Sequence, residues 1–548
     1  MMHGHGKSDS AIVASKPANK AEQPAAEHSA AGAAAAEPVE RRAETEENAD
    51  QQSTCRAQSR ENVSPALDRI RQVARSRKEE RFTSLLHHVN PDRLKAAFYE
   101  LKENASPGVD GVTWDQYEAD LDREIEDLHG RVHRGAYRAL PSRRVYIPKP
   151  DGRQRPLAVA ALEDKIVQRA TAQVLNAIYE EDFLGFSYGF RPGRSAHDAM
   201  DALVVGIEHR TVNFILDADI QSFFDRVNHD WLIRFVEHRI GDQRVIRLIQ
   251  KWLKVGVLED GIVTASKQGT GQGAVISPLL ANIYLHYSLD LWAERWRRRE
   301  TTGDRIFVRY ADDFIAGFEH EHDARRFLDA LRERLAQFAL TLHPEKTRLI
   351  EFGRYAALNR KRRGLGKPET FNFLGFTFIC GKSRKGRFLI KRKTRRDRMR
   401  AKLVAVSEGL RQRRHWPIHE TGKWLGYVVK GYFNYHAVPT NSHALQEFYD
   451  EIVQRWRRAL RRRSQRDRTS WDSVVKLAHE WLPRPRVLHP WPNQRFAVSH
   501  PRWEPYAGKP HVRICAGGAR QLASLPLSAY KPTAVRMAGH CNSTPAHS

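Results

Sequence analysis

Cysteine is scarce in this sequence, and the few cysteines stand apart. The four among 548 residues are Cys55, Cys380, Cys515 and Cys541, and none of them forms a Cys-x-x-Cys pair. This spacing predicts neither a disulfide framework nor a zinc site.

Long hydrophobic runs are also missing. No stretch reaches the roughly 18 apolar residues that a membrane-spanning helix requires. The first residues carry no hydrophobic segment of the kind found in secretory signals. We therefore expect a cytoplasmic protein without a membrane partner.

The two ends of the chain lack regular hydrophobic patterning. Residues 1–62 are rich in Ala, Glu, Gln and Ser and have almost no large apolar side chains. They cannot bury enough surface to offset chain entropy, so we expect them to be disordered. Residues 481–548 open with a Pro- and aromatic-rich run that predicts irregular, extended backbone. This tail is either a small nucleic-acid contact or a degenerate terminus.

Acidic residues are few relative to basic ones. Lys and Arg total 91 against 65 acidic residues, which gives a formal charge of +26. An excess of this size favours a polyanionic partner such as nucleic acid. The charge is concentrated, because residues 382–400 alone hold eleven Lys or Arg, and residues 455–468 form a second cluster.

The most informative stretch is residues 305–318. Two β-prone runs, Ile306 to Val308 and Phe314 to Phe318, flank Asp312 and Asp313, which predicts a hairpin with two carboxylates at its tip. Taken alone, two Asp residues at a turn are common, because Asp favours turns. Adjacent carboxylates on a stiff hairpin repel each other, however, and usually need a cation.

A third carboxylate is expected beside this hairpin. Residues 212–220 read as an apolar strand and residues 223–240 as a helix, so Asp219 lies at the strand-to-helix switch. Asp217 shares its face and reads as a solvent-facing edge residue. With the amphipathic helix at 322–338, the elements follow a ferredoxin-like β-α-β-β-α order, which sets the first strand beside the hairpin.

Three converging carboxylates without His or Cys suit a hard cation such as Mg²⁺, with Mn²⁺ as a substitute. Two such ions held by shared carboxylates are what in-line displacement at phosphorus requires. The residues therefore indicate phosphoryl or nucleotidyl transfer.

An ordered series of segments resembles the group II intron-encoded reverse transcriptases/maturases. The matching stretches are SPGVDGVT (106–113), RRVYIPKPDGRQRPLAV (143–159), FSYGFRPGRSAHDAM (186–200), ILDADIQSFFD (215–225), QGTGQGAVISPLLANIYL (268–285), YADD (310–313) and FNFLGF (371–376). The resemblance implies an α+β right-hand polymerase, with fingers at 63–205, a ferredoxin-like palm at 206–385 and a helical, basic thumb (domain X) at 386–480.

Carried over by position, the resemblance implies that Asp219, Asp312 and Asp313 are the catalytic metal ligands, with the Ile220 carbonyl as a further oxygen ligand. Phe224 falls where these enzymes hold an aromatic ring against the 2′ position of the incoming sugar. A bulky ring there excludes a 2′-hydroxyl and so predicts use of dNTPs. The alternative for Phe224 is a simple core residue.

The resemblance also implies a dNTP site made of Lys149, Arg155, Gln272 and Gly273. Lys149 and Arg155 lie in a strand-turn-strand pattern, where two cations can hold a triphosphate; a basic surface hairpin is the alternative. Gln272-Gly273 opens a helix expected from near Val275. Here the chain departs from the family pattern, because Gly271 replaces the usual Pro and Ala274 the usual Gly.

In maturases the thumb contacts template-primer and intron RNA. A packed bundle whose aromatics are all core is the alternative interpretation of this region. The weak candidates for nucleic-acid contact are Tyr310, Lys391, Arg392, Lys393, Arg395, Arg396, Tyr432, Asn434 and Tyr435.

The resemblance thus implies an RNA-directed DNA polymerase of a mobile group II intron, with a maturase role in splicing and retrohoming. Its partners would be intron RNA, a DNA target or primer, and dNTPs, and a homodimer is left open. We expect no HNH endonuclease module, because cysteine pairs are missing. The alternatives are a polymerase-inactive RNA-binding splicing factor and a repurposed defence-type reverse transcriptase.

Overall fold

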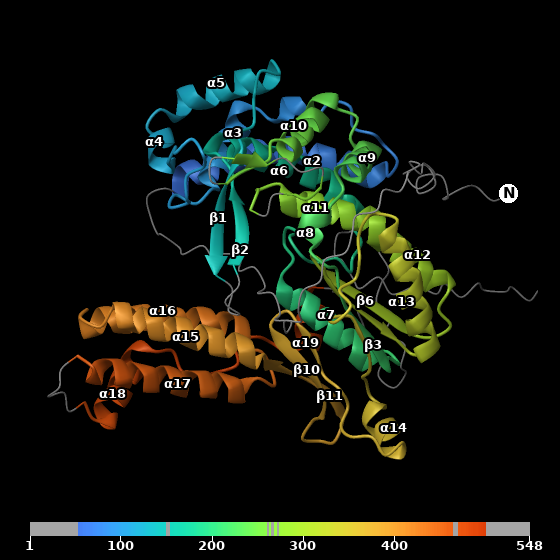
Figure 1. The fold of residues 1–548 in the computed structure, drawn as a ribbon, viewed down its shortest axis with the longest axis vertical. Helices are drawn as coiled ribbons and strands as arrows, with labels where there is room; N and C mark the ends of the chain where they lie inside the picture. The colour runs from blue at the N-terminus through green and yellow to red at the C-terminus, as the bar shows by residue number, and fades with distance from the viewer. Residues whose placement is uncertain are drawn as a thin grey trace, which may run out of the picture.

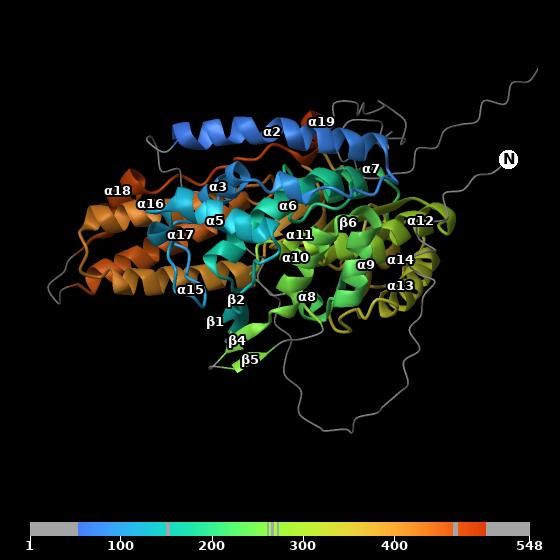
Figure 2. The ribbon, with the colours of Figure 1, turned by 90° about the horizontal axis from the view of Figure 1, so that it is seen from above.

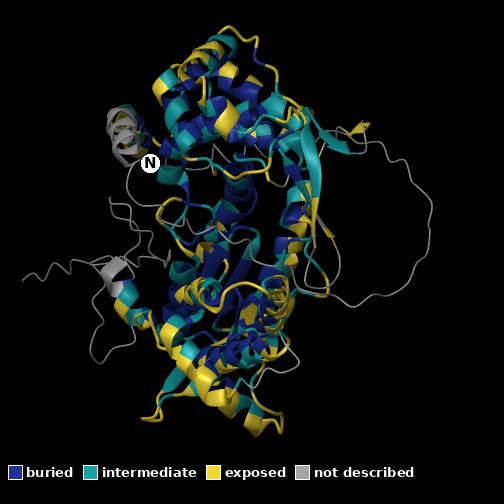
Figure 3. Ribbon diagram, turned by 90° about the vertical axis from the view of Figure 1, so that its left-hand side faces the viewer, coloured by how far each residue is buried: buried dark blue, intermediate teal, exposed yellow. Residues whose placement is uncertain are grey.

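A computed structural model describes residues 53–148, 154–259, 262–264, 268–270, 273–463 and 469–499. Figure 1 shows a helical region at the top, a central sheet flanked by helices and a helical bundle at the lower left. In the side view of Figure 3, buried residues concentrate in the helical region and around the central sheet.

The N-terminal region is a group of helices packed around α6. Polar caps set where several of them begin: Asn90 accepts a hydrogen bond from the Arg93 N–H, and Thr113 and Gln116 form a capping box. The first helix begins at Ser53, so the expectation of disorder is wrong for residues 53–62, while residues 1–52 lie outside the described part. The elements are α2 (Ser53–Ser76), η1 (Leu86–His88), α3 (Pro91–Tyr99), α4 (Trp114–Glu118), α5 (Leu121–His133) and α6 (Leu162–Asp182).

A four-stranded sheet extends from this region in the order β2-β1-β4-β5. The predicted strand-turn-strand pattern is confirmed, since β1 and β2 pair antiparallel with Ile147 opposite Arg155. The strands are β1 (Ser142–Pro148), β2 (Gln154–Val159), β4 (Val257–Glu259) and β5 (Ile262–Thr264).

The central sheet has the order β6-β7-β3-β8, with every neighbouring pair antiparallel. The prediction that the first strand lies beside the hairpin is confirmed. Leu216 and Phe314 face one hydrophobic cluster, whereas Ile215 and Ile315 face another, so both sides of the sheet are buried. The elements are α7 (Ala196–His209), β3 (Phe214–Asp219), β6 (Arg305–Tyr310), β7 (Asp313–Phe318), α13 (Glu321–Ala336) and β8 (Arg348–Glu351).

The helix expected over 223–240 is divided into two. The first piece ends at Arg226, and Asn228 caps the second, because its side chain accepts a hydrogen bond from the Trp231 N–H. The helix expected from Val275 begins at Ser277, with Pro278 in its first turn. The helices here are α8 (Phe223–Arg226), α9 (His229–Arg239), α10 (Gln243–Lys254), α11 (Ser277–Leu285), the π-helical turn η2 (His286–Asp290) and α12 (Leu291–Arg299).

A third sheet precedes the bundle. Its order is β11-β10-β9. The helical pattern expected from residue 386 is therefore wrong for 388–394, which form a strand. Ile390, Arg392 and Thr394 are buried at alternate positions, as a strand with one inward face requires. The elements are α14 (Ala356–Arg362), β9 (Phe371–Phe373), β10 (Phe376–Lys382) and β11 (Phe388–Thr394).

The C-terminal helices form a bundle with its own core, which contains the fully buried Trp456. Figures 1 and 2 show α15, α16 and α17 lying lengthwise against one another. The helices are α15 (Arg396–Gln412), α16 (Ile418–His436), α17 (Ser442–Arg461) and α18 (Trp471–Trp481).

The segment after the bundle returns to the central sheet. A last helix, α19 (Pro492–Ser499), follows the Pro-rich run, so the expectation of irregular backbone is wrong for these residues. Phe496 is buried in the cluster that also contains Ile215 and Ile315. His209 on α7 is hydrogen-bonded to Asn493 at 2.9 Å. Residues 500–548 lie outside the described part.

Among the described residues, no helix is both long and apolar enough to cross a membrane. Cys380, whose surroundings are described, is a free thiol.

Candidate active site

The three predicted carboxylates lie on neighbouring backbone positions. Asp219, the last residue of β3, is directly opposite Asp313, the first residue of β7. Asp312 precedes Asp313 in the turn between β6 and β7. Figure 1 shows β3 and the β6–β7 hairpin in the central sheet, below the helical region.

The backbone directions place Asp219 and Asp313 at one of the closely spaced positions of the antiparallel ladder. The Asp219 carbonyl accepts a hydrogen bond from the His343 N–H at 2.8 Å, on the side of β3 away from the hairpin. Asp219 and Asp313 are therefore a non-hydrogen-bonded pair, in which Cα atoms lie about 4.5 Å apart. Because successive peptide groups alternate, the Ile220 carbonyl points toward the hairpin, as a further oxygen ligand must.

The hairpin tip has an unusual backbone conformation. Ala311 has a φ of 56°, in the left-handed region that non-glycine residues rarely adopt. Gly189 packs directly against this turn, since a Cβ at position 189 would lie 2.2 Å from the Ala311 nitrogen. The segment containing Gly189 is held to the hairpin by the Tyr188 N–H, which donates to the Arg309 carbonyl at 2.9 Å.

A buried arginine supports the tip from behind. Arg309 donates to both carboxylate oxygens of Asp290, at 2.8 and 2.6 Å, and both side chains are fully buried. Its remaining N–H groups reach Asn282 at 3.1 Å, Ser187 at 2.7 Å and the Ala311 carbonyl at 2.8 Å. All five guanidinium donors are thus used, one of them on the residue that precedes Asp312.

Two basic residues that the sequence analysis did not select contact the acidic face of β3. The Lys346 ammonium lies 2.8 Å from Oδ2 of Asp219. Arg348 lies 3.3 Å from Asp217, opposite it on β8. Burial raises the pKa of Asp217 to about 6, and Arg348 opposes that rise. Asp217 is therefore only partly exposed, not the solvent-facing edge residue expected.

The donor set fits a hard divalent cation by its chemistry. It consists of carboxylate and carbonyl oxygens, which Mg²⁺ prefers. Among the described residues, however, no three acidic, His or Cys side chains already surround a common point. Asp219 is instead engaged by the Lys346 ammonium, which shows that a cation is accommodated at this carboxylate. Lys346 makes this contact with Oδ2, and a carboxylate has two oxygens that can hold a cation.

Phe224 lies beside this site and is partly exposed. It belongs to α8, and its ring contacts Phe223 and Phe190 edge-on at centroid distances of 5.4 and 6.4 Å. Its carbonyl accepts a hydrogen bond from the Thr270 N–H at 2.8 Å, which ties α8 to the segment before the predicted Gln-Gly pair. Phe224 is therefore not a simple core residue, because its ring is partly exposed while it contacts two other aromatic rings.

The dNTP candidates are described only in part. Lys149 and Gln272 lie outside the described residues. Arg155 lies in β2, but its side chain is not described. Gly273 has a φ of +111°, and a Cβ there would come within 2.7 Å of the Ala158 carbonyl. Only glycine allows this close approach of the loop to β2.

Two of the weak nucleic-acid candidates, Arg392 and Tyr432, are buried structural residues. Arg392 is 2% exposed and forms a buried ion pair with Asp201 at 2.6 Å. Tyr432 is 4% exposed and stacks on Phe448 at a centroid distance of 3.6 Å. Neither side chain reaches the surface, because each has its partner inside the fold.

The remaining candidates differ in their access to solvent. Tyr435 donates its hydroxyl to the Leu374 carbonyl at 2.8 Å, and burial raises its pKa. Arg395 is largely covered and pairs with Asp397 at 2.6 Å. Lys393, Arg396 and Asn434 are exposed, whereas Lys391 and Tyr310 are half-buried.

The first turn of α15 approaches the carboxylates. Burial lowers the pKa of Arg398, while the negative charges of Asp397 and Asp313 raise it. Arg398 was not selected from the sequence, although it lies in the basic run 382–400. Its electrostatic interaction with Asp313 shows that α15 begins beside the hairpin tip.

Comparison with known proteins bears on this geometry. Residues 147–378, which contain all three carboxylates, match the family model described as reverse transcriptase (RNA-dependent DNA polymerase). The chain is 38% identical over 238 residues to Protein YkfC of Escherichia coli (strain K12), covering 38% of this chain and 62% of that protein.

Two further relatives are named for introns. The chain is 30% identical over 303 residues to the group II intron-encoded protein LtrA of Lactococcus lactis subsp. cremoris, covering 53% of this chain and 50% of that protein. It is 36% identical over 198 residues to an uncharacterized 91 kDa protein in cob intron of Schizosaccharomyces pombe, covering 36% of this chain and 24% of that protein. The match therefore spans 62% or less of each of these relatives.

Proposed function

We propose that this chain, which matches the reverse transcriptase family model over residues 147–378 and is similar to a group II intron-encoded protein, is an RNA-directed DNA polymerase of a mobile group II intron. The single observation that carries the proposal is the pairing of Asp219 with Asp313 on adjacent strands, with Asp312 at the turn. These carboxylates lie inside the span that matches the reverse transcriptase family.

In this proposal Asp219, Asp312, Asp313 and the Ile220 carbonyl hold two Mg²⁺ ions. Such a pair would activate the attacking hydroxyl and stabilise the leaving pyrophosphate in nucleotidyl transfer. The chain's own contribution is to fix the carboxylates: Arg309 and Gly189 hold the tip, and β3 presents Asp219 opposite it. Lys346 balances negative charge at Asp219.

We assign the right-hand architecture on the same basis. The fingers would be residues 63–205, the palm 206–385 and the thumb 386–480, with β11 at the start of that last segment. Lys149, Arg155, Gln272 and Gly273 would bind the dNTP, and Phe224 would exclude its 2′-hydroxyl. The half-exposed ring of Phe224, which is tied through its carbonyl to Thr270, supports this placement.

Primer extension on an RNA template tests the proposal. Purified protein with Mg²⁺ and dNTPs is expected to extend an annealed DNA primer, and Asp312→Asn is expected to abolish product while RNA binding persists. Asp329→Asn is the matched control, because Asp329 is 71% exposed on α13. Wild-type protein that binds RNA but makes no product would instead favour the polymerase-inactive splicing factor.

A second candidate function is maturation of the intron RNA, followed by retrohoming into DNA. It is supported by two relatives named for introns and by the formal charge of +26. The test is splicing of the RNA that surrounds this reading frame, at a Mg²⁺ concentration too low for self-splicing. Acceleration by both wild-type protein and Asp312→Asn would support the role, and no acceleration would favour a repurposed defence-type enzyme.

A further inference from the structure

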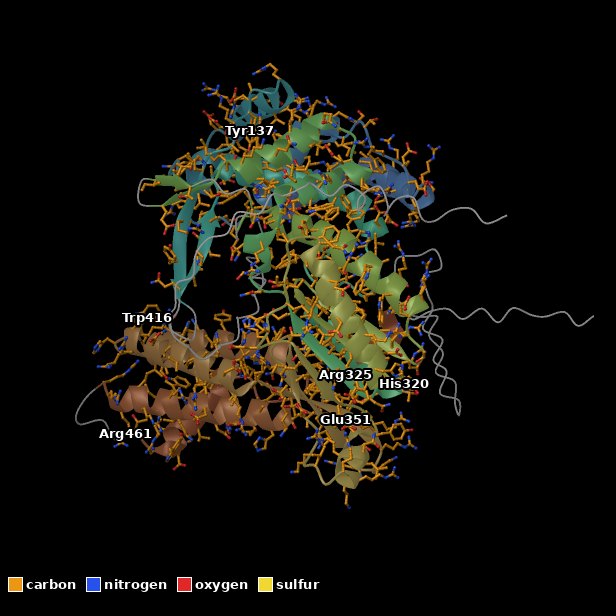
Figure 4. All side chains as sticks on the ribbon, turned by 45° about the vertical axis from the view of Figure 1, so that its right-hand side comes forward. Tyr137, His320, Arg325, Glu351, Trp416 and Arg461 are labelled. Atoms are coloured by element: carbon orange, nitrogen blue, oxygen red, sulfur yellow. The ribbon has the colours of Figure 1, made fainter. Side chains whose placement is uncertain are left out.

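Five arginines line a groove of about 380 Å³ between α15 and α17. Arg411 and Arg414 come from the end of α15 and the turn after it, and Arg455, Arg458 and Arg462 from the end of α17. Figure 4 labels Trp416 and Arg461 at this outer end of the bundle, far from the central sheet.

The groove is built by one face of each helix. On α17, positions 455, 458, 459 and 462 follow the three- and four-residue spacing that places side chains on a single face. On α15, positions 404, 407, 408 and 411 do the same. Two regular faces therefore direct their basic side chains toward one shared space.

The groove carries a surplus of positive charge. Glu408 is the one acidic residue among those that line it, and Arg455 pairs with Glu451 outside it. Arg411, Arg414, Arg458 and Arg462 form no ion pair with the residues that the structure describes. Cations are favoured in the last turn of a helix by about 0.3–1 kcal/mol each, but that preference does not account for an open groove between them.

Part of the groove lining is apolar. Val404, Leu410 and Ala459 contribute to it, together with the arginines. A guanidinium group binds phosphate through two parallel hydrogen bonds, and an apolar lining suits the face of a base. An acidic peptide would use the arginines but would leave the apolar residues without a partner.

We propose that the α15–α17 groove binds an unpaired nucleotide of a structured RNA, with its base on the apolar lining residues and the flanking phosphates on the arginines. RNA loops present such unstacked bases, whereas a continuous duplex does not. The inference rests on the proposed function only in taking RNA as the partner.

The groove lies apart from the carboxylates, because none of the residues that line it belongs to β3, β6 or β7.

The test uses the full chain with Arg411→Gln and Arg458→Gln combined. Binding of an RNA hairpin with an unpaired loop is compared with a blunt RNA duplex of equal length, by fluorescence anisotropy over a range of salt. We expect about tenfold weaker binding of the hairpin RNA and a salt slope reduced by about 1.4, as two lost single-strand phosphate contacts require. Binding of the duplex should change less than twofold.

The matched control is Arg325→Gln with Arg332→Gln. These residues are 68% and 58% exposed on α13, and their removal subtracts the same charge. Figure 4 places Arg325 beside the central sheet, away from the bundle. The control should bind both RNAs like wild-type protein, and thermal denaturation should show that both variants are folded.

Three results would overturn the inference. Equal weakening of hairpin and duplex would indicate general attraction without a nucleotide site. Unchanged hairpin binding would show that the groove is not used, and loss of polyglutamate binding alone would indicate an acidic protein partner. Primer extension on a pre-annealed substrate separates this inference from the proposed polymerase. If wild-type protein does not extend the primer but the double variant still binds the hairpin RNA more weakly than wild-type protein, only the proposed polymerase activity is refuted.

Discussion

Arg309 and Asp290 form a fully buried ion pair, 2.6 Å apart, directly behind the turn that carries Asp312. The arginine also holds the Ala311 carbonyl, so the pair connects the helical segment around Asp290 to the hairpin tip. Asp290 ends a π-helical turn, a form of helix that is frequent at functional sites. The position of the carboxylates therefore depends on a charge pair that touches none of them.

Replacing Arg309 by Lys should impair both stability and catalysis. A lysine has three donors in place of five and cannot bind a carboxylate with two parallel bonds, so Asp290 and the Ala311 carbonyl lose partners. Breaking a buried pair costs about 3–5 kcal/mol, and we expect a loss at the lower end, measured by thermal denaturation together with primer extension. Arg298→Lys is the control and should change little, because the Arg298 side chain is 58% exposed in its pair with Glu294. Full activity of Arg309→Lys would show that the tip needs no such support.

Gly189→Ala should displace the hairpin tip. An added Cβ would lie 2.2 Å from the Ala311 nitrogen, so the backbone of one segment must move. We expect primer extension to fall by at least about tenfold, a barrier change of 1.4 kcal/mol, while the fold persists. Gly193→Asn is the control, since position 193 has open space and Asn tolerates its φ of +69°. An active Gly189→Ala enzyme would contradict the close packing.

The carboxylates could be predicted because their signals are local. Asp312 and Asp313 stand between two β-prone runs, and Asp219 closes an apolar strand, so the order of elements was enough to pair them. The supporting residues gave no such signal. Arg309 and Lys346 look like two more basic residues among 91, and only tertiary contacts reveal that one is buried and the other meets Asp219.

The errors have a common physical cause. The resemblance implies Arg392 and Tyr432 as weak nucleic-acid contacts, but an ion pair and a ring stack bury them. Because Arg392 is a charged residue at a buried position, it interrupts the apolar alternation of β11, and the basic run predicts a helix where the structure has a strand. The helix α19 was missed because its burial depends on α7, almost 300 residues earlier in the chain.

Phe224→Ala should relax the choice between dNTPs and rNTPs. Removing the ring would open the space where a 2′-hydroxyl must fit, and a loss of 1.4 kcal/mol in discrimination corresponds to about tenfold. Incorporation of each nucleotide type is measured by single-nucleotide extension. Phe223→Leu is the control, because Phe223 is 2% exposed in the core and should affect stability alone. Unchanged selectivity in Phe224→Ala would reject the assignment of the gate.

Asp242 should make stability depend on pH. Burial alone would raise its pKa, but hydrogen bonds from Arg244, Leu85 and Leu86 lower the pKa to about 2. Because the folded-state pKa is depressed, the stabilisation is present above the unfolded value near 4 and is lost as the pH falls toward 2. It amounts to about 2–3 kcal/mol at neutral pH.

The measurement is denaturation of Asp242→Asn and wild-type protein at pH 7 and again near pH 3. The difference between the two proteins should be large at pH 7 and should shrink at pH 3, where Asp242 of the wild-type protein begins to be protonated. Asp329→Asn should show no such dependence, because Asp329 is mostly exposed. A difference that is the same at both pH values would contradict the assignment.

Asp201 joins three distant segments through one buried carboxylate. It lies on α7, with Arg392 of β11 at 2.6 Å and Arg495 of α19 at 3.3 Å. The Leu488 N–H also donates to the Ala437 carbonyl at the end of α16, at 2.9 Å, so the C-terminal segment connects the bundle to the central sheet. Loss of the carboxylate would leave two mutually repelling arginines without this ion-pair partner.

Asp201→Asn should therefore release the C-terminal segment from α7. We expect a destabilisation of about 3–5 kcal/mol, as for any broken buried pair, and faster tryptic cleavage between α18 and α19. Arg495→Gln removes only the partly exposed partner and should accelerate cleavage with a smaller loss of stability, since Arg392 keeps its pair. If cleavage of this segment is unchanged in both variants while thermal stability falls, the carboxylate supports only the core, and the segment is held by Phe496 and Asn493 instead.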